Sequence, residues 1–147
     1  MTTTSAVGPA DHVAILNLYA AYNWAADDGD GDAWGACFTE DATFLINDAL
    51  WRGSRAELLE KRRRPVPGAP RQHWNSSVVL TQLEPGVVEG RAQLVALDVI
   101  DGQPAIKMVG AYRDRVVRTP DGSWRFAQRH ITSYYSEIDG ELYRNRT

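Results

Sequence analysis

The sequence predicts an α+β fold in which three N-terminal helices pack on a curved antiparallel sheet and enclose a pocket. Helical periodicity and capping signals occur before residue 64 of the 147-residue chain. After residue 71 the pattern is that of long strands, with turn signals at 84–86, 101–102 and 120–122. Because such turns join neighbouring antiparallel strands, the resulting meander should lie over the helical layer.

The first helix is expected to start around Pro9 and Asp11, and Asp11 could cap its free N–H groups. Gly29, Gly31 and the aspartates beside them are expected to end it. Between these limits the apolar residues form one helical stripe: Ile15, Leu18, Tyr19, Tyr22 and Ala26. This spacing predicts that one face of the helix is buried.

Two further helices and a short strand are expected before the sheet. Asp32 could cap a short second helix around Trp34, and residues 42–46 have the pattern of a strand. A capping box at 54–57 predicts a third helix over residues 55–63, which stops before a proline.

Four long strands are expected near residues 72–82, 87–100, 104–118 and 123–136. We therefore predict a flexible N-terminal tail at 1–10, a single domain at 11–136 and a C-terminal tail at 137–147. A domain of this length can bury a sizeable core.

Composition and charge narrow the classes of function. Apolar residues make up 44% and charged residues 24%, as is ordinary for a soluble globular protein. A net charge of −3 and a pI of about 5.6 argue against a nucleic-acid partner.

No apolar run reaches the roughly 18 residues of a membrane span. Residues 1–5 lack the features of a signal peptide, so we expect a cytoplasmic protein with no membrane partner. Cys37 is the single cysteine and is expected to be a buried core thiol.

A metal or cofactor site is not expected. Asp28, Asp30 and Asp32 match the first ligand positions of an EF-hand calcium loop. Ala33 stands where that loop requires glycine, and Thr39 where it requires glutamate. We therefore predict no metal site, and without a phosphate loop or dinucleotide motif we expect no cofactor.

Asp27 and His73 are the best candidates for proton-transfer chemistry. Asp27 lies four residues after Asn23 and eight after Tyr19, so it stays near the buried stripe, where a carboxylate must be paired. His73 shares a strand face with Asn75. A carboxylate that orients one ring nitrogen of a histidine leaves the other free to act as a base. The structural alternatives are a cap or salt bridge for Asp27 and a core role for His73.

Polar side chains are frequent around the predicted pocket: Tyr22, Asn23, Asp27, His73, Asn75 and Tyr112. A core built only for stability would avoid so many groups that need partners, which favours a ligand pocket.

Strict alternation would place four residues on one strand face: His73, Asn75, Ser77 and Val79. On the last strand it would place His130, and not Arg129, with Trp124 and Phe126, whereas a bulge would reverse that assignment.

The order of several segments resembles the SnoaL-like branch of the nuclear transport factor 2-like superfamily, an α+β cone fold. These segments, within residues 11–135, are Ile15–Tyr19 leading to Asp27, Phe38–Ala42, Trp51–Gly53 and Asp121–Phe126. The closest likeness is to the group of scytalone dehydratase, hexachlorocyclohexane dehydrochlorinase and bile-acid 7α-dehydratase.

This resemblance implies that His73 and Asp27 form a catalytic His–Asp dyad, and it favours the bulge that turns Arg129 inward. The residues expected to bind substrate are Tyr22, Asn23, Asn75, Tyr112, Arg129 and His130. The implied function is a cofactor-independent lyase or isomerase that acts on a hydrophobic cyclic or polyketide-like small molecule.

Other functions fit the same superfamily. An aldol-type polyketide cyclase could use the same residues. A non-catalytic protein, either a ligand binder or a structural subunit like a dioxygenase β chain, would need no dyad. One broad sheet face could be apolar through Val95, Leu97, Val99, Val109 and Ala111. Since such a face needs covering and family members commonly pair through it, we expect a homodimer or a higher homo-oligomer.

Overall fold

The computed structural model describes residues 6–47, 49–50, 70–138 and 141–144. In chain order its elements are α1 (Pro9–Asp28), α2 (Gly31–Ala36), β1 (Phe38–Ile46), β2 (Ala49–Leu50), β3 (Arg71–Glu84), β4 (Val87–Ile100), β5 (Gln103–Arg118), β6 (Trp124–Ile138) and β7 (Glu141–Arg144). The predicted third helix at 55–63 lies outside the described residues.

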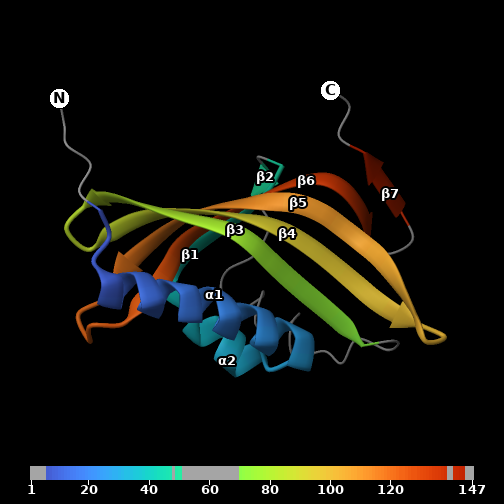
Figure 1. Cartoon of the computed structure of the whole chain (residues 1–147), viewed down its shortest axis with the longest axis horizontal. Helices are drawn as coiled ribbons and strands as arrows, with labels where there is room; N and C mark the ends of the chain where they lie inside the picture. The colour runs from blue at the N-terminus through green and yellow to red at the C-terminus, as the bar shows by residue number, and fades with distance from the viewer. Residues whose placement is uncertain (1–5, 48, 51–69, 139–140, 145–147) are drawn as a thin grey trace.

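The described strands form one sheet in the order β2-β1-β6-β5-β4-β3, with β7 paired to β6. Strands β3 to β6 form the predicted antiparallel meander, whereas β1 pairs parallel with β6, so the sheet is mixed. Figure 1 shows α1 and α2 along one face of the long curved strands. We call this the inner face and the opposite side the outer face. The predicted α+β architecture is confirmed.

Regular structure extends beyond both predicted domain limits. α1 begins at Pro9, inside the predicted tail, because proline has no N–H to leave unpaired and its φ suits the first helical position. β6 continues to Ile138 and pairs with β7 (Glu141–Arg144), which corrects the interpretation of residues 137–147 as a tail.

The start of α1 is tied to the sheet by Asp11. Gly8 is the N-cap of the helix, so Asp11 is not the cap that the sequence predicts. Its Oδ1 instead accepts hydrogen bonds from Arg118 Nη2 and, at 3.1 Å, from Trp124 Nε1. Asp11 thus joins α1 to the strands β5 and β6.

The apolar stripe of α1 is buried as predicted at Ile15, Leu18, Tyr19 and Tyr22. Gly29 ends the helix in the left-handed conformation, with φ of 70°. The chain turns there, so Asp30, and not the predicted Asp32, caps α2 by accepting a hydrogen bond from Ala33 N at 2.9 Å. None of the described helices is long and apolar enough to cross a membrane.

The core lies between the two helices and the inner face of the sheet. Trp34 and Phe38 pack with ring centroids 4.6 Å apart, and Phe126 contacts Phe38 at 5.6 Å. Such aromatic pairs add about 0.5–1.5 kcal/mol each beyond the area they bury. Cys37 is buried beside them, as predicted, and burial raises the pKa of its thiol to about 11.

A bulge in β3 changes which side chains face the core. The register with β4 shifts between Ser76 and Val79, and Ser77 adopts a φ of 53°. Val78 and Leu80 therefore pack against the core, whereas Val79 is 58% exposed. This corrects the strict alternation expected for β3 beyond Ser76. Residues before the bulge keep the predicted face.

Candidate active site

Asp27 and His73 meet at the inner face, where the last turn of α1 lies against the start of β3. His73 Nδ1 is 2.5 Å from Asp27 Oδ1, and the backbone N–H of His73 donates to Asp27 Oδ2 at 3.0 Å. The side chains are 12% and 15% exposed, respectively. Both carboxylate oxygens are therefore held by one residue, although 46 positions separate the two in sequence.

This geometry favours one tautomer of the neutral imidazole. An ionised carboxylate can only accept, so this tautomer has its proton at Nδ1. Nε2 then carries the lone pair, and it has no hydrogen-bond partner among the described residues. A neutral histidine oriented in this way can take a proton from a bound molecule.

A second polar contact joins the same two elements beside the dyad. Asn23, one turn before Asp27 on α1, donates from Nδ2 to Asn75 Oδ1 at 2.6 Å. Asn75, two residues after His73, donates from Nδ2 to the carbonyl oxygen of Gln93 at 3.4 Å. The two predicted asparagines therefore lie next to the dyad and contact each other.

Arg129 faces the core because β6 contains a bulge. The register with β5 shifts between Phe126 and Gln128, which leaves Ala127 as the extra residue. Arg129 is consequently fully buried, whereas His130 follows it on the opposite face. This corrects the prediction of His130 as a pocket residue and agrees with the inward position expected of Arg129.

Arg129 forms a buried ion pair that sequence reasoning missed. Its Nε and Nη2 donate to the two oxygens of Asp114 at 3.0 and 2.8 Å, and Tyr19 OH donates to Asp114 Oδ2 at 2.5 Å. Burial by itself would lower the pKa of Arg129, but the charge and hydrogen bonds of Asp114 outweigh it and raise that pKa well above its usual value. Burial, reinforced by the Asp114 charge, raises the pKa of Tyr19, so its hydroxyl remains a donor.

Aromatic rings enclose the guanidinium. Arg129 Cζ lies 3.7 Å from the ring centroid of Tyr112 and 4.1 Å from those of Tyr22 and Phe126. Tyr22 and Tyr112 are only 1% and 2% exposed. Three of the predicted substrate-binding residues therefore pack against one another on the inner face: Tyr22, Tyr112 and Arg129.

Asp114 has a sequence signal that could have found it. It lies two residues after Tyr112, so alternation along β5 places both on the inner face, where an unpaired carboxylate would be costly. Gly90 on β4 pairs with Asp114 and faces Tyr19. A side chain at Gly90 would collide with the Tyr19 hydroxyl, so glycine is what allows that hydroxyl to reach Asp114.

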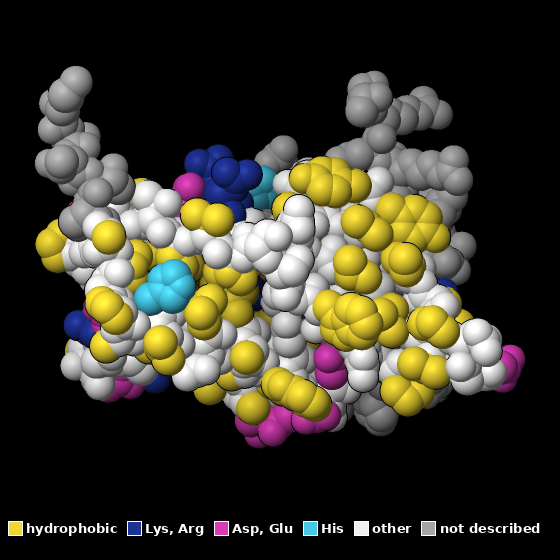
Figure 2. All heavy atoms as spheres, in the orientation of Figure 1, with side chains coloured by type: hydrophobic (Ala, Val, Ile, Leu, Met, Phe, Trp, Pro, Cys, Tyr) yellow, Lys and Arg dark blue, Asp and Glu magenta, His cyan; other side chains and the backbone are white. Residues whose placement is uncertain are grey.

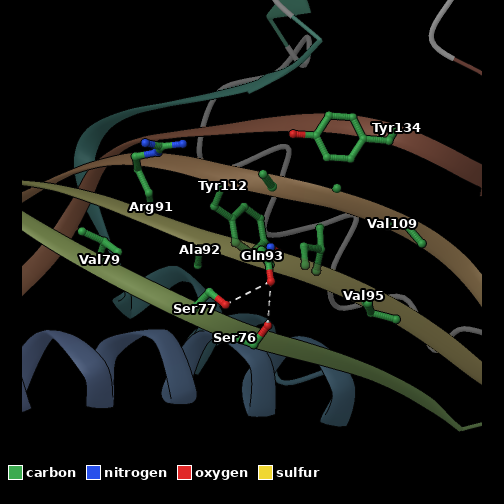
Figure 3. A pocket seen from close by; sticks show the side chains of 13 residues that line it. Ser76, Ser77, Val79, Arg91, Ala92, Gln93, Val95, Val109, Tyr112 and Tyr134 are labelled. Carbon is green, nitrogen blue, oxygen red and sulfur yellow. Dashed lines mark hydrogen bonds between the residues drawn. The ribbon is translucent and has the colours of Figure 1, made fainter.

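A groove of about 540 Å³ lies on the outer face, and Tyr112 is also among its lining residues. Figure 3 shows its wall side chains, including Arg91, Gln93 and Tyr134, on the side of the sheet away from the helices. Ser76 and Ser77 donate to Gln93 Oε1 across its floor, at 3.4 and 3.0 Å. Neither member of the dyad lines this groove.

The fold agrees with one protein family. Residues 10–130 match the model of the SnoaL-like domain. The chain therefore belongs to the SnoaL-like family, as the order of its segments indicates. None of the curated proteins matches it.

Solved structures of similar fold cover most of the chain. A variant of Rv3472 from Mycobacterium tuberculosis, described as a protein of unknown function, is 28% identical and covers 88% of this chain and 78% of its own, with a TM-score of 0.74. A proposed scytalone dehydratase from Novosphingobium aromaticivorans is 17% identical over 94% and 95% of the two chains, with a TM-score of 0.77. The β subunit of a proposed aromatic-ring-hydroxylating dioxygenase from the same organism is 22% identical over 82% and 87%, with a TM-score of 0.69. The last two establish likeness of fold alone.

Proposed function

We propose that the protein is a cofactor-independent lyase or isomerase, dehydratase-like, that acts on a hydrophobic cyclic or polyketide-like small molecule. The observation that carries this proposal is the 2.5 Å contact between His73 Nδ1 and Asp27 Oδ1 at the inner face. A carboxylate and an imidazole in this arrangement need no further group to move a proton.

In the proposed reaction, His73 Nε2 removes a proton from a carbon beside a carbonyl group. The electron pair of the broken C–H bond forms a carbon–carbon double bond. In a lyase the leaving group departs with its own bonding pair and takes up the proton from the imidazolium. In an isomerase the π pair of the carbonyl group moves to its oxygen as the double bond forms, and it returns when the imidazolium gives the proton to a different carbon of the conjugated system. Asp27 keeps the imidazole in the required tautomer and stabilises the imidazolium that forms.

Arg129 and Tyr22 would complete the site at its base. Arg129 Nη1 is buried and has no hydrogen-bond partner among the described residues. Because Asp114 already balances the guanidinium charge, a neutral carbonyl oxygen suits this donor better than an anion, which would add an uncompensated buried charge. The aromatic rings around Arg129 favour a largely apolar substrate.

Single substitutions in the dyad test this function. A panel of cyclic hydroxyketones would be screened for the absorbance of conjugated products. We expect His73→Ala to lower turnover by about 10²–10⁴-fold, the usual contribution of a general base, with an unchanged circular dichroism spectrum. His12→Ala, at the other end of α1, is the matched control and should keep full turnover. Near-normal turnover in His73→Ala would remove the dyad from the mechanism.

Asp27→Asn separates orientation of the base from substrate binding. We expect kcat to fall strongly while ligand affinity changes little, because the apolar surroundings survive and only the imidazole loses its orienting group. Full turnover in Asp27→Asn would contradict the orienting role of this carboxylate.

The tight packing around Arg129 gives a second candidate function some support. Side chains of the protein itself fill the space around Arg129, and this suits a structural subunit that binds no small molecule. The similar dioxygenase β subunit has this fold. If no compound of the panel binds and His73→Ala only changes stability, that alternative is favoured. Substrate screening would also separate a dehydratase from an aldol-type cyclase.

We further propose that the protein is a homodimer paired through the outer face. Val95, Val109 and Ala111 line the groove there, and Trp74 beside them is 59% exposed. Leu97, which the sequence also placed on this face, is buried. Figure 2 shows hydrophobic side chains at the surface over the long strands, and apolar surface of this kind would lose contact with water in a dimer.

A further inference from the structure

A buried acceptor beside the dyad has no donor. Asn23 Oδ1 is shielded from solvent and makes no hydrogen bond among the described residues. An unpaired buried carbonyl oxygen is unfavourable, so natural proteins rarely keep one without a reason. Asn23 Oδ1 is therefore available to accept a hydrogen bond from a bound molecule.

The hydrogen bonds of Asn75 indicate which side-chain atom of Asn23 has no hydrogen-bond partner. Asn75 Nδ2 donates to the Gln93 carbonyl, which turns Asn75 Oδ1 toward Asn23. That oxygen requires a donor, and Asn23 Nδ2 supplies it at 2.6 Å. The reverse orientation of both amides would bring Asn75 Oδ1 against the Gln93 carbonyl oxygen, which is repulsive. The leftover atom is thus the acceptor Oδ1.

The acceptor lies within reach of a molecule that contacts the base. Asn23 and Asp27 are four residues apart on α1, one turn or about 6 Å along the helix axis. On β3, Asn75 and His73 are two residues apart on the same face, a spacing of about 6.6 Å. A single ring-sized molecule can span residue spacings of this size and so contact both His73 and Asn23.

From these contacts we propose that Asn23 Oδ1 accepts a hydrogen bond from a hydroxyl group of the substrate. The inference rests on the proposed function and makes Asn23 the residue that selects a hydroxylated substrate over its deoxy counterpart. A buried acceptor rejects an analogue that lacks the hydroxyl, because binding of that analogue leaves the oxygen unpaired.

Equilibrium binding by calorimetry tests the assignment. The probes are α-tetralone and the isomers that carry one hydroxyl group on its saturated ring. We expect at least one isomer to bind about tenfold more tightly than α-tetralone, as is typical for satisfying a buried acceptor. If no isomer is preferred, or if none binds, the proposal is wrong. Repeating the titrations with His73→Ala prevents turnover of the probe and keeps this result independent of the dyad.

Two variants distinguish recognition from a structural role. Asn23→Leu removes the acceptor, whereas the matched control Asn75→Leu breaks the same interresidue hydrogen bond and leaves Asn23 Oδ1 in place. We expect the preference for the hydroxylated probe to disappear in Asn23→Leu. In Asn75→Leu the affinity for both probes should fall alike, so that the preference persists. Equal loss in both variants would show that the pair only supports the fold.

Thermal stability provides a readout that does not depend on the probes. Asn23→Leu should unfold at a higher temperature than Asn75→Leu, because it removes the unpaired oxygen that Asn75→Leu retains. The opposite order would overturn the proposal, since it would mean that the folded state already satisfies Asn23 Oδ1.

Discussion

Replacement of Asp114 by alanine should destabilise the protein severely. Asp114 accepts three hydrogen bonds, two from Arg129 and one from Tyr19, and both side chains of the ion pair are 0% exposed. Asp114→Ala leaves the guanidinium charge buried without a counter-ion. Loss of one partner of a buried pair typically costs about 3–5 kcal/mol. That is a large part of the roughly 5–15 kcal/mol by which a domain is stable.

Urea unfolding followed by tryptophan fluorescence would measure this loss as a shift in the midpoint. The neighbouring pair of Arg113 and Glu89 is the control, because its N–O distance is also short, at 2.9 Å, but Arg113 is 69% exposed. Glu89→Ala should cost less than about 1 kcal/mol, as exposed ion pairs usually do. If Asp114→Ala lowered the free energy of unfolding by less than about 1 kcal/mol, burial would not explain the value of this ion pair.

A double variant separates the penalty of an unpaired charge from the net value of the pair. Asp114→Leu combined with Arg129→Met replaces the ions by apolar side chains of similar volume. We expect it to recover most of the stability lost in Asp114→Ala, because a buried pair is often no better than well-packed apolar residues. If the double variant were as unstable as Asp114→Ala, the ion pair itself would be the stabilising element.

Three further predictions concern the Cys37 thiol, the Asp98 carboxylate and the outer face of the sheet. Burial raises the pKa of Cys37 to about 11, so the native thiol should react with iodoacetamide many-fold more slowly than the unfolded one, and equal rates would contradict this. The hydrogen bond from Arg71 lowers the pKa of Asp98. The stability that ionised Asp98 contributes to the folded protein is therefore present above the pKa of about 3.9 that Asp98 has in the unfolded chain. It is lost as the pH falls through the lower pKa of Asp98 in the folded protein. Asp98→Asn should flatten the acid side of the stability profile, and an unchanged slope would argue against the pair. Light scattering at micromolar concentration should find a dimer that Val109→Arg converts to a monomer, whereas a monomeric unmodified protein would refute pairing through the outer face.

The sequence by itself determined the elements whose signals are local. The stripe on α1, the glycine that ends it and the turns between the long strands are all set by residues a few positions apart. Periodicity therefore predicted the α+β class and the meander. Sequence reasoning also selected Asp27 and His73, because a carboxylate near a buried stripe needs a partner. The hydrogen bond between them is visible only in the folded chain.

Tertiary structure decided the direction in which side chains point beyond each bulge. One extra residue at Ser77, and another at Ala127, reverses the alternation of a strand. That reversal turns Arg129 inward and His130 outward. Whether a strand bulges depends on its neighbours in the sheet and on the helices beneath, and these are distant in sequence. The partners of Arg129 were hidden for the same reason, since Tyr19 and Asp114 are 95 positions apart and are brought together only when the sheet closes over α1.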